Sequence, residues 1–77
     1  MEFSVFLKDF CSQFEDEDIQ IGETERFRLT TSWDSLTGMA VLYMIEHNYN
    51  IEIPVEDFLK LETPREIFEY ICKREKV

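Results

Sequence analysis

Apolar residues recur every three to four positions in four stretches of this chain, and that spacing places them on one face of an α-helix. A long polar connection separates the first two stretches, and the third stretch is short. The pattern therefore predicts an all-α fold, a four-helix bundle with a short third helix and a long first loop. The predicted helices cover residues 2–14, 35–48, 55–59 and 63–73.

The first predicted helix carries a strongly aromatic face. Four phenylalanines and one leucine fall on it at helical spacing, and polar residues occupy the opposite face. We expect this face to supply much of the core, since aromatic side chains bury a large apolar area. An acidic run at residues 15–18 should end the helix, because negative charge opposes the dipole at a helix C-terminus. The predicted core residues are Phe3, Phe6, Leu7, Phe10 and Phe14.

Residues 19–32 form a long connection without a sustained helical period. Connections of this length are uncommon in compact domains. We expect apolar side chains to anchor this one against the bundle, and a short helical turn near residues 23–27. The expected anchors are Ile19, Ile21, Phe27 and Leu29.

The second predicted helix is apolar around nearly its whole circumference. Such a helix is either fully buried or offers a face to a partner. Gly38 inside it costs roughly 1 kcal/mol against alanine. Close helix packing would account for this glycine, and so would close approach by a partner or a prosthetic arm. The core stripe expected at helical spacing is Leu36, Met39, Leu42, Ile45 and Tyr49, widened by Val41.

The last two predicted helices have marked starts. Pro54 pre-sets the third helix, and Pro64 suits the first position of the fourth. Thr63 can cap the fourth helix, and Glu66 completes a capping box. The side chains expected to point inward are Phe58, Leu59, Leu61, Ile67, Phe68, Tyr70 and Ile71.

Composition narrows the function classes. The 77 residues fit one small domain spanning 1–77, and 8 basic against 17 acidic residues give a net charge of -9. That charge argues against nucleic acid and anionic membranes as partners. No run is long enough to span a bilayer, and the start lacks signal-peptide features, so we expect a cytoplasmic protein. Cys11 and Cys72 are expected to be reduced, and too few ligands are present for a zinc site.

Ser35 stands where the polar connection becomes the second helix. A hydroxyl there is exposed, lies at the positive end of the helix dipole and neighbours backbone N–H groups without partners. Such a position suits a phosphate ester. The alternative is that Asp34 or Ser35 simply caps the helix, since both are favoured N-cap types.

The sequence gives little support for catalysis by the chain itself. His47, the one histidine, follows Ser35 by about twelve residues, which is about 18 Å along a helix. A nucleophile and its base must lie within hydrogen-bond reach. We therefore predict that the protein is not an enzyme.

Three short motifs stand at the starts of the last three predicted helices. They are Asp34-Ser35-Leu36, Glu52-Ile53-Pro54 eighteen residues downstream, and Thr63-Pro64 beyond. With the long first loop before them, the motifs in this order resemble the acyl carrier protein family. The resemblance covers nearly the whole chain, is strongest over residues 33–71, and implies a four-helix bundle of the acyl-carrier type.

The resemblance implies a defined chemistry. Ser35 would accept 4'-phosphopantetheine from coenzyme A through a phosphodiester, transferred by a separate phosphopantetheinyl transferase with magnesium. Asp34 would help to position coenzyme A and the metal, and Leu36 would dock into partner enzymes. The thiol of the arm would hold an acyl group as a thioester, and the partners would be acyl-loading and acyl-processing enzymes. We expect a monomer, since such a carrier visits several enzymes in turn.

The sequence departs from fatty-acid carriers in its second helix, which in those proteins is rich in acidic residues. Thr37, Ala40 and His47 stand where acids are usual, so electrostatic steering by this helix should be weak. We therefore interpret the chain as a specialised carrier for a fatty-acid or polyketide-type pathway, which docks through an apolar patch. An aminoacyl or peptidyl carrier, and a small helical interaction module without a prosthetic group, remain alternatives. The expected partner-binding residues are Leu36, Met39, Ala40, Tyr43, Glu46 and His47.

Overall fold

The computed structural model describes residues 2–16 and 18–75, and these residues form helices and loops without a strand. The predicted fold class is confirmed, with a short third helix and a long first loop. Glu17, part of the predicted acidic run, lies outside the described residues. The elements are α1 (Phe3–Cys11), the 3-10 turn η1 (Phe27–Leu29), α2 (Ser35–Tyr49), α3 (Val55–Phe58) and α4 (Pro64–Glu75).

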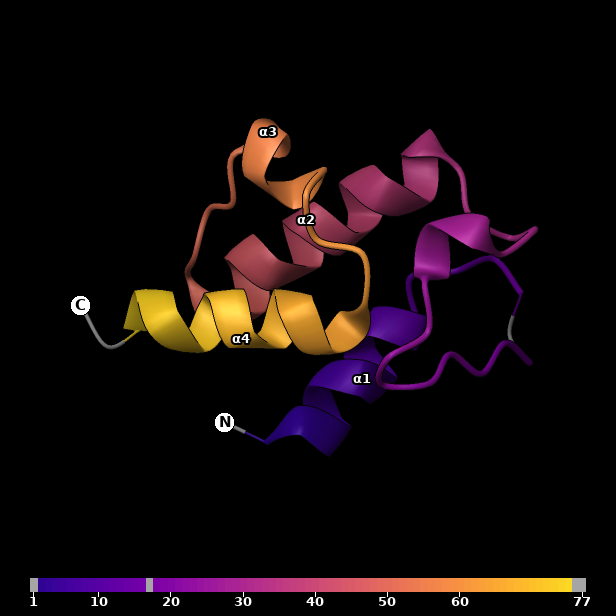
Figure 1. Cartoon of the computed structure of the whole chain (residues 1–77), viewed down its shortest axis with the longest axis horizontal. Helices are drawn as coiled ribbons and strands as arrows, with labels where there is room; N and C mark the ends of the chain where they lie inside the picture. The colour runs from indigo at the N-terminus through magenta and orange to yellow at the C-terminus, as the bar shows by residue number, and fades with distance from the viewer. Residues whose placement is uncertain (1, 17, 76–77) are drawn as a thin grey trace.

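Helix α1 contacts both α2 and α4. Figure 1 shows α4 alongside α1, with α3 lying over α2. The connection from α1 to α2 runs around one end of the bundle and carries η1 (Figure 1). The start of α2 therefore lies at that end.

The aromatic face of α1 is buried as predicted. Phe6, Phe10 and Phe14 lie in the core, and Phe3 and Leu7 pack half-buried against it. The α-helix ends at Cys11, three residues earlier than expected. The chain continues to Phe14 in tighter turns, because the N–H of Phe14 donates to the Cys11 carbonyl at 3.1 Å.

Aromatic rings continue from α1 towards the start of α2. The Phe10 and Phe27 centroids lie 5.2 Å apart in an edge-to-face pair, and those of Phe27 and Trp33 lie 4.8 Å apart. Phe14 adds a further pair with Trp33 at 5.8 Å. Pairs of this kind contribute about 0.5–1.5 kcal/mol each beyond the area they bury. Trp33, which the helical pattern did not place in the core, thus joins α1 to the start of α2.

The long connection is anchored, but not by all the expected residues. Ile21 and Phe27 are buried and Ile19 is half-buried, as predicted, whereas the prediction for Leu29 is wrong because its side chain is 78% exposed. The helical turn lies at Phe27–Leu29, slightly after the expected position. Arg28, which precedes Leu29 in this turn, is half-buried, and its guanidinium donates to the carbonyl of Phe58 at 2.7 Å.

Backbone contacts tie the same connection to the start of α4. The N–H of Phe27 donates to the Glu62 carbonyl at 3.3 Å, and the N–H of Arg65 donates to the Glu23 carbonyl at 3.0 Å. The side chains of Arg65 and Glu23 also form an ion pair at 2.8 Å. These contacts hold a stretch that has little regular secondary structure.

The predicted core stripe of α2 is wrong at its first two positions. Leu36 is 70% exposed and Met39 is 67% exposed, although Ile45 is buried as expected. Leu42 and Tyr49 lie half-buried at the edge of the core. The helix is turned so that a neighbouring stripe faces inward. Its buried residues are Thr37, Gly38, Val41, Met44 and Ile45.

In α3, only one side of a four-residue helix reaches the core. Phe58 is buried and Leu61 is half-buried, as predicted. The prediction for Leu59 is wrong, since its side chain is 64% exposed. Leu59 follows Val55 by one helical turn, and the two lie on the solvent side together.

The inward face of α4 agrees with the prediction. Ile67, Phe68 and Ile71 are buried, and Tyr70 is half-buried, with its hydroxyl donating to the carboxylate of Asp57 at 2.9 Å. This hydrogen bond ties α4 to α3. Cys11 and Cys72 are free and half-buried, as expected.

The capping box before α4 is present in a shifted form. The hydroxyl of Thr63 accepts a hydrogen bond from the N–H of Glu66 at 3.2 Å, as the motif predicts. The Glu66 carboxylate accepts from the N–H of Glu62 at 3.0 Å, one residue before the expected partner.

Candidate functional site

Asp34 is the N-cap of α2. Its backbone is extended, and its carboxylate accepts a hydrogen bond of 2.7 Å from the N–H of Thr37. The first intrahelical hydrogen bond runs from the N–H of Gly38 to the Asp34 carbonyl at 3.1 Å. The hydrogen bond from Thr37 holds the pKa of Asp34 below its ordinary value, because it stabilises the ionised carboxylate. Of the two capping candidates in the sequence, Asp34 takes the role.

Ser35 is the first residue of α2, and it is exposed. Because Asp34 supplies the cap, the hydroxyl of Ser35 is not used for that purpose. The residue lies at the positive end of a 15-residue helix, where backbone N–H groups favour negative charge. The arrangement suits a serine that bears a phosphodiester.

A hollow of about 410 Å³ opens beside Ser35, between α2 and α3. This volume falls within the range of small-molecule sites, roughly 300–1,000 Å³. Apart from a guanidinium, a carboxylate and a hydroxyl, its walls are apolar. The lining residues are Arg28, Trp33, Asp34, Ser35, Gly38, Met39, Leu42, Val55, Phe58 and Leu59.

Trp33 explains why α2 contains a glycine. A Cβ atom at Gly38 would lie 3.1 Å from the indole atom Cζ2 of Trp33 and 3.9 Å from the Phe58 ring. The nearer distance is shorter than ordinary van der Waals contact. Of the two explanations that the sequence allowed, close internal packing therefore accounts for Gly38.

Arg28 is a cation within an aromatic cluster at the same site. Its guanidinium carbon lies 4.9 Å from the Phe27 ring centroid, 5.0 Å from that of Phe58 and 5.8 Å from that of Trp33. The side chain also donates to the carbonyls of Phe58 and Leu61. Partial burial lowers the pKa of Arg28, but an arginine stays protonated in proteins. The residue holds η1 against the end of α3 and thereby shapes one wall of the hollow.

Two further hollows adjoin the one at Ser35. One of about 220 Å³ shares Arg28 and Leu59 with it, and one of about 380 Å³ shares Met39, Leu42 and Val55. The shared residues place the three hollows next to one another, and together we call them the depression along the α2–α3 face. Its far part is bordered by the exposed acids Glu46 and Glu52.

Exposed apolar side chains gather around this depression. The exposed large apolar residues include Val5 on α1, and the others lie on η1, on α2, on α3 or, for Leu59, directly after α3. An exposed apolar surface of this kind, rimmed by polar residues, is typical of an interaction site. We call this surface the apolar face, and it consists of Leu29, Leu36, Met39, Tyr43, Val55 and Leu59.

The expected partner-binding residues of α2 have different exposures. Tyr43, Glu46 and His47 are exposed, and the Tyr43 and His47 rings stack with centroids 5.9 Å apart. Ala40 is half-buried. Thr37 is only 4% exposed, so the position that is usually acidic in fatty-acid carriers points into the core here.

Sequence reasoning missed the contribution of α3 and η1 to the apolar face. The sequence pattern does not single out Val55, and it predicts that Leu29 and Leu59 are buried. The spacing of Val55 and Leu59, one turn apart on a very short helix that already buries Phe58, was the available signal.

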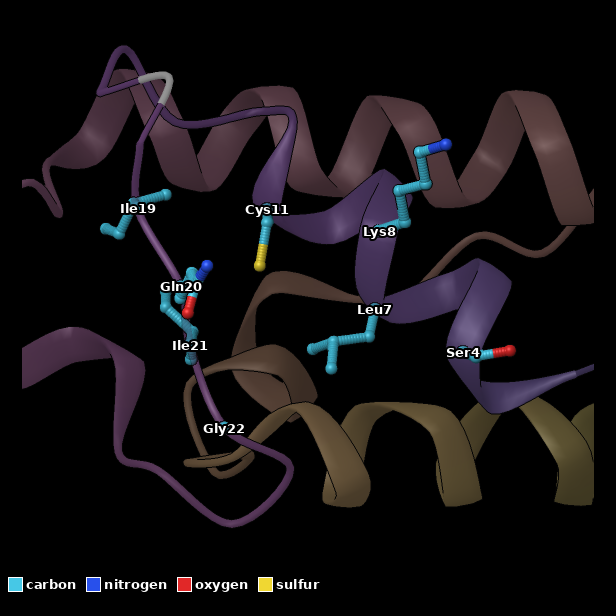
Figure 2. Close-up of a pocket in the computed structure, with 8 residues that line it drawn as sticks. All are labelled: Ser4, Leu7, Lys8, Cys11, Ile19, Gln20, Ile21 and Gly22. Carbon is cyan, nitrogen blue, oxygen red and sulfur yellow. The ribbon is translucent and has the colours of Figure 1, made fainter.

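A separate hollow of about 560 Å³ lies between α1 and the first connection. Figure 2 shows Leu7, Ile19, Ile21 and the Cys11 thiol gathered around it, with Lys8 and Ser4 on α1. Its lining includes no residue of the hollow at Ser35.

Within residues 2–16 and 18–75, no group of three or more histidine, cysteine or acidic side chains is arranged to hold a metal ion. No helix in the same residues is long and apolar enough to cross a membrane.

Comparison with known families identifies the class of protein. Residues 6–71 match the family described as phosphopantetheine attachment site, and the chain belongs to this family. The resemblance to acyl carrier proteins is thereby confirmed, and the helical fold agrees with it. Domains of this family covalently attach 4'-phosphopantetheine, typically on a serine, and act as non-catalytic carriers that interact with transferases and acyl-processing enzymes. No curated protein and no solved structure gave a significant match.

Proposed function

We propose that this chain is a carrier whose 4'-phosphopantetheine arm is attached to Ser35. The observation that carries the proposal is the position of this serine, exposed at the start of α2 beside a largely apolar hollow. The other serines of the matched segment fit less well. Ser12 donates its hydroxyl to the Asp9 carbonyl at 2.7 Å, and Ser32 is half-buried in the loop.

The residues around Ser35 fit the arm chemically. The terminal thiol of the arm supplies the chemistry of the carrier, since it holds an acyl group as a thioester. Asp34 keeps a carboxylate beside the hydroxyl, where it suits the positioning of the magnesium ion and coenzyme A of a transferase. The apolar walls of the hollow, Met39 and Val55 among them, suit the uncharged parts of the arm and its cargo.

We further propose a specialised role in a fatty-acid or polyketide-type pathway, with docking through the apolar face. Among the exposed positions of α2, Glu46 is the one acid, so a strongly basic partner surface would find little complementary charge on this helix. Leu36, Met39 and Tyr43 present apolar area instead. The partner that fits is an enzyme whose docking cleft is mainly apolar.

Intact-mass measurement tests the attachment site. The wild type, incubated with coenzyme A, magnesium and a promiscuous phosphopantetheinyl transferase, is expected to gain the mass of one phosphopantetheine. Ser35→Ala should show no gain, while the matched variants Ser12→Ala and Ser32→Ala should be modified like the wild type. A gain on Ser35→Ala would move the site to another residue. No gain on folded wild type, with an active transferase, would favour the interaction module instead.

Binding to a fatty-acid ketosynthase across a salt series tests the docking surface. Affinity should depend weakly on salt, and Met39→Ala and Tyr43→Ala should each weaken binding about tenfold, which is about 1.4 kcal/mol. Val5→Ala is the control, because Val5 is also exposed but lies on α1. Tight, steeply salt-sensitive binding that survives both α2 substitutions would contradict docking through the apolar face.

A further inference from the structure

Trp33 lies at the junction between the hollow and the core. Its ring centroid lies 4.8 Å from that of Phe27, 5.8 Å from that of Phe14 and 6.3 Å from that of Phe58. These rings belong to η1, to the turn after α1 and to α3, and Gly38 of α2 approaches the indole as well. The side chain is only half-buried and lines the hollow at Ser35. The indole therefore lies, beside Phe58, between the space next to Ser35 and the buried rings of Phe14 and Phe27.

The interior behind the indole is already occupied. Phe27 is fully buried and Phe14 is 5% exposed. An apolar chain that entered the hollow from Ser35 would meet the indole, and to pass it towards Phe14 and Phe27 it would have to displace the indole from these rings. Close-packed interiors resist such displacement. In front of the indole, the hollow beside Ser35 offers a chain about 410 Å³, near the lower end of ligand sites.

We infer that Trp33 is a specificity-determining residue, which limits the length of the cargo that this carrier shelters. The inference rests on the proposed function, because it requires an arm at Ser35. Cargo that fits the hollow would be withdrawn from water beside Met39, Leu42 and Val55. Longer cargo would extend over the α2–α3 face, where solvent and partner enzymes reach it.

The experiment loads wild type and Trp33→Leu with acyl groups of increasing length and measures the rate of thioester cleavage by hydroxylamine. Intact mass, recorded first, establishes loading, so failure of the proposed function is seen separately as absence of the arm. Each buried CH₂ should slow cleavage of the wild type by up to about fourfold until the hollow is filled. Beyond that length the rate should level off.

In Trp33→Leu the rate should level off at a longer chain, since the smaller side chain opens the path towards Phe14 and Phe27. Phe3→Leu is the matched control, because it replaces another half-buried aromatic ring with leucine, on α1, where the side chain does not line this hollow. It should behave like the wild type. The inference would be overturned if the cleavage rate levelled off at the same acyl-chain length in the wild type and Trp33→Leu. It would also be overturned if the cleavage rate did not depend on chain length in either protein.

Fluorescence of the wild type gives a reading that does not depend on how well the variant folds. Trp33 is the one tryptophan of the chain. Its emission should shift with each added carbon up to the length at which cleavage levels off, and then stay constant. Emission that is the same for every loaded length would overturn the inference. Trp33→Phe, which keeps an aromatic ring at the junction, should level off between the wild type and Trp33→Leu.

Discussion

The carboxylate of Asp34 and the backbone N–H of Thr37 form a hydrogen bond of 2.7 Å that starts α2. The same carboxylate lies next to the serine proposed to carry the arm. Loss of Asp34 would therefore disturb the folding of the helix start as well as any role in loading. Asparagine separates the two effects, because it can cap a helix but carries no charge.

We predict that Asp34→Asn reduces the dependence of stability on acidic pH. The pKa of Asp34 is lower in the folded state than in the unfolded state, so the unfolded state binds more protons as pH falls below about 4. The carboxylate therefore stabilises the fold fully above its unfolded pKa, and this contribution is lost as pH falls through the folded pKa. Urea unfolding of the wild type and Asp34→Asn should show that the free energy of unfolding falls less steeply with decreasing pH in the variant.

Glu52→Gln is the control for that series, since Glu52 is an exposed acid in the loop between α2 and α3. In Glu52→Gln the free energy of unfolding should depend on acidic pH about as it does in the wild type. Equal pH dependence in Asp34→Asn and the wild type would contradict the assignment of Asp34 as an ionised cap.

A second prediction concerns Arg28, whose donors reach the carbonyls of Leu61 at 2.5 Å and Phe58 at 2.7 Å. We expect Arg28→Ala to lower the free energy of unfolding by about 2 kcal/mol, after allowance for the partial exposure of these charge-assisted hydrogen bonds. Arg28→Lys should recover less than half of this, because an ammonium cannot reproduce the fork geometry. Denaturant unfolding monitored by circular dichroism measures both.

Arg26→Ala provides the comparison in the same connection. Arg26 pairs with Glu62 at 3.5 Å with both side chains largely exposed, so its loss should cost less than about 1 kcal/mol. If the two alanine variants were equally destabilised, the contacts of Arg28 with α3 would not be its main contribution.

Helical spacing predicted the elements of this fold well, because each amphipathic helix has a single way to bury its apolar side. In α4, Ile67 and Ile71 face the core and charged residues face solvent. In α2 the spacing failed at Leu36 and Met39, since a helix without a charged face offers several stripes of equal period. The choice was made by packing: Gly38 has to face Trp33, and this turns Leu36 to the surface.

The candidate site also has one part that the sequence predicts and one part that it does not. The position of Ser35 at the start of a helix follows from local sequence, because the Asp34 cap is a short-range interaction. The hollow beside it depends on where Val55, Phe58 and Trp33 meet. Trp33 is distant in sequence from Val55 and Phe58, and its contacts with α3 are tertiary, so spacing within one helix gave no sign of them.

The left-handed residue at the end of α2 gives a third prediction. Asn50 has a φ of 57°, and its N–H donates to the Glu46 carbonyl at 2.9 Å. Asn50→Ala should lower the free energy of unfolding by about 1 kcal/mol, because a Cβ atom disfavours this conformation and asparagine tolerates it better. Asn50→Gly should be neutral or slightly stabilising. Thermal unfolding compares both with Asn48→Ala, an exposed helical control expected to lie within about 0.5 kcal/mol of the wild type.

The fourth prediction is that Gly38 and Trp33 are energetically coupled. Alanine at position 38 should favour the helix by about 1 kcal/mol, but its methyl group would lie 3.1 Å from the indole. We therefore expect Gly38→Ala to gain much less than this in the wild type and nearly the full amount in Trp33→Leu. The double-mutant cycle, measured by urea unfolding, should give a coupling of at least about 0.5 kcal/mol.

Gly22→Ala is the matched glycine for this cycle, because the nearest atom to a Cβ there belongs to the Glu25 side chain at 3.9 Å. Its effect should add to that of Trp33→Leu without coupling. Additivity at Gly38 as well would mean that the indole moves aside without cost. An acyl chain in the hollow could then displace the Trp33 side chain easily. The limit on cargo length would have to arise from Met39, Leu42 or Val55 instead.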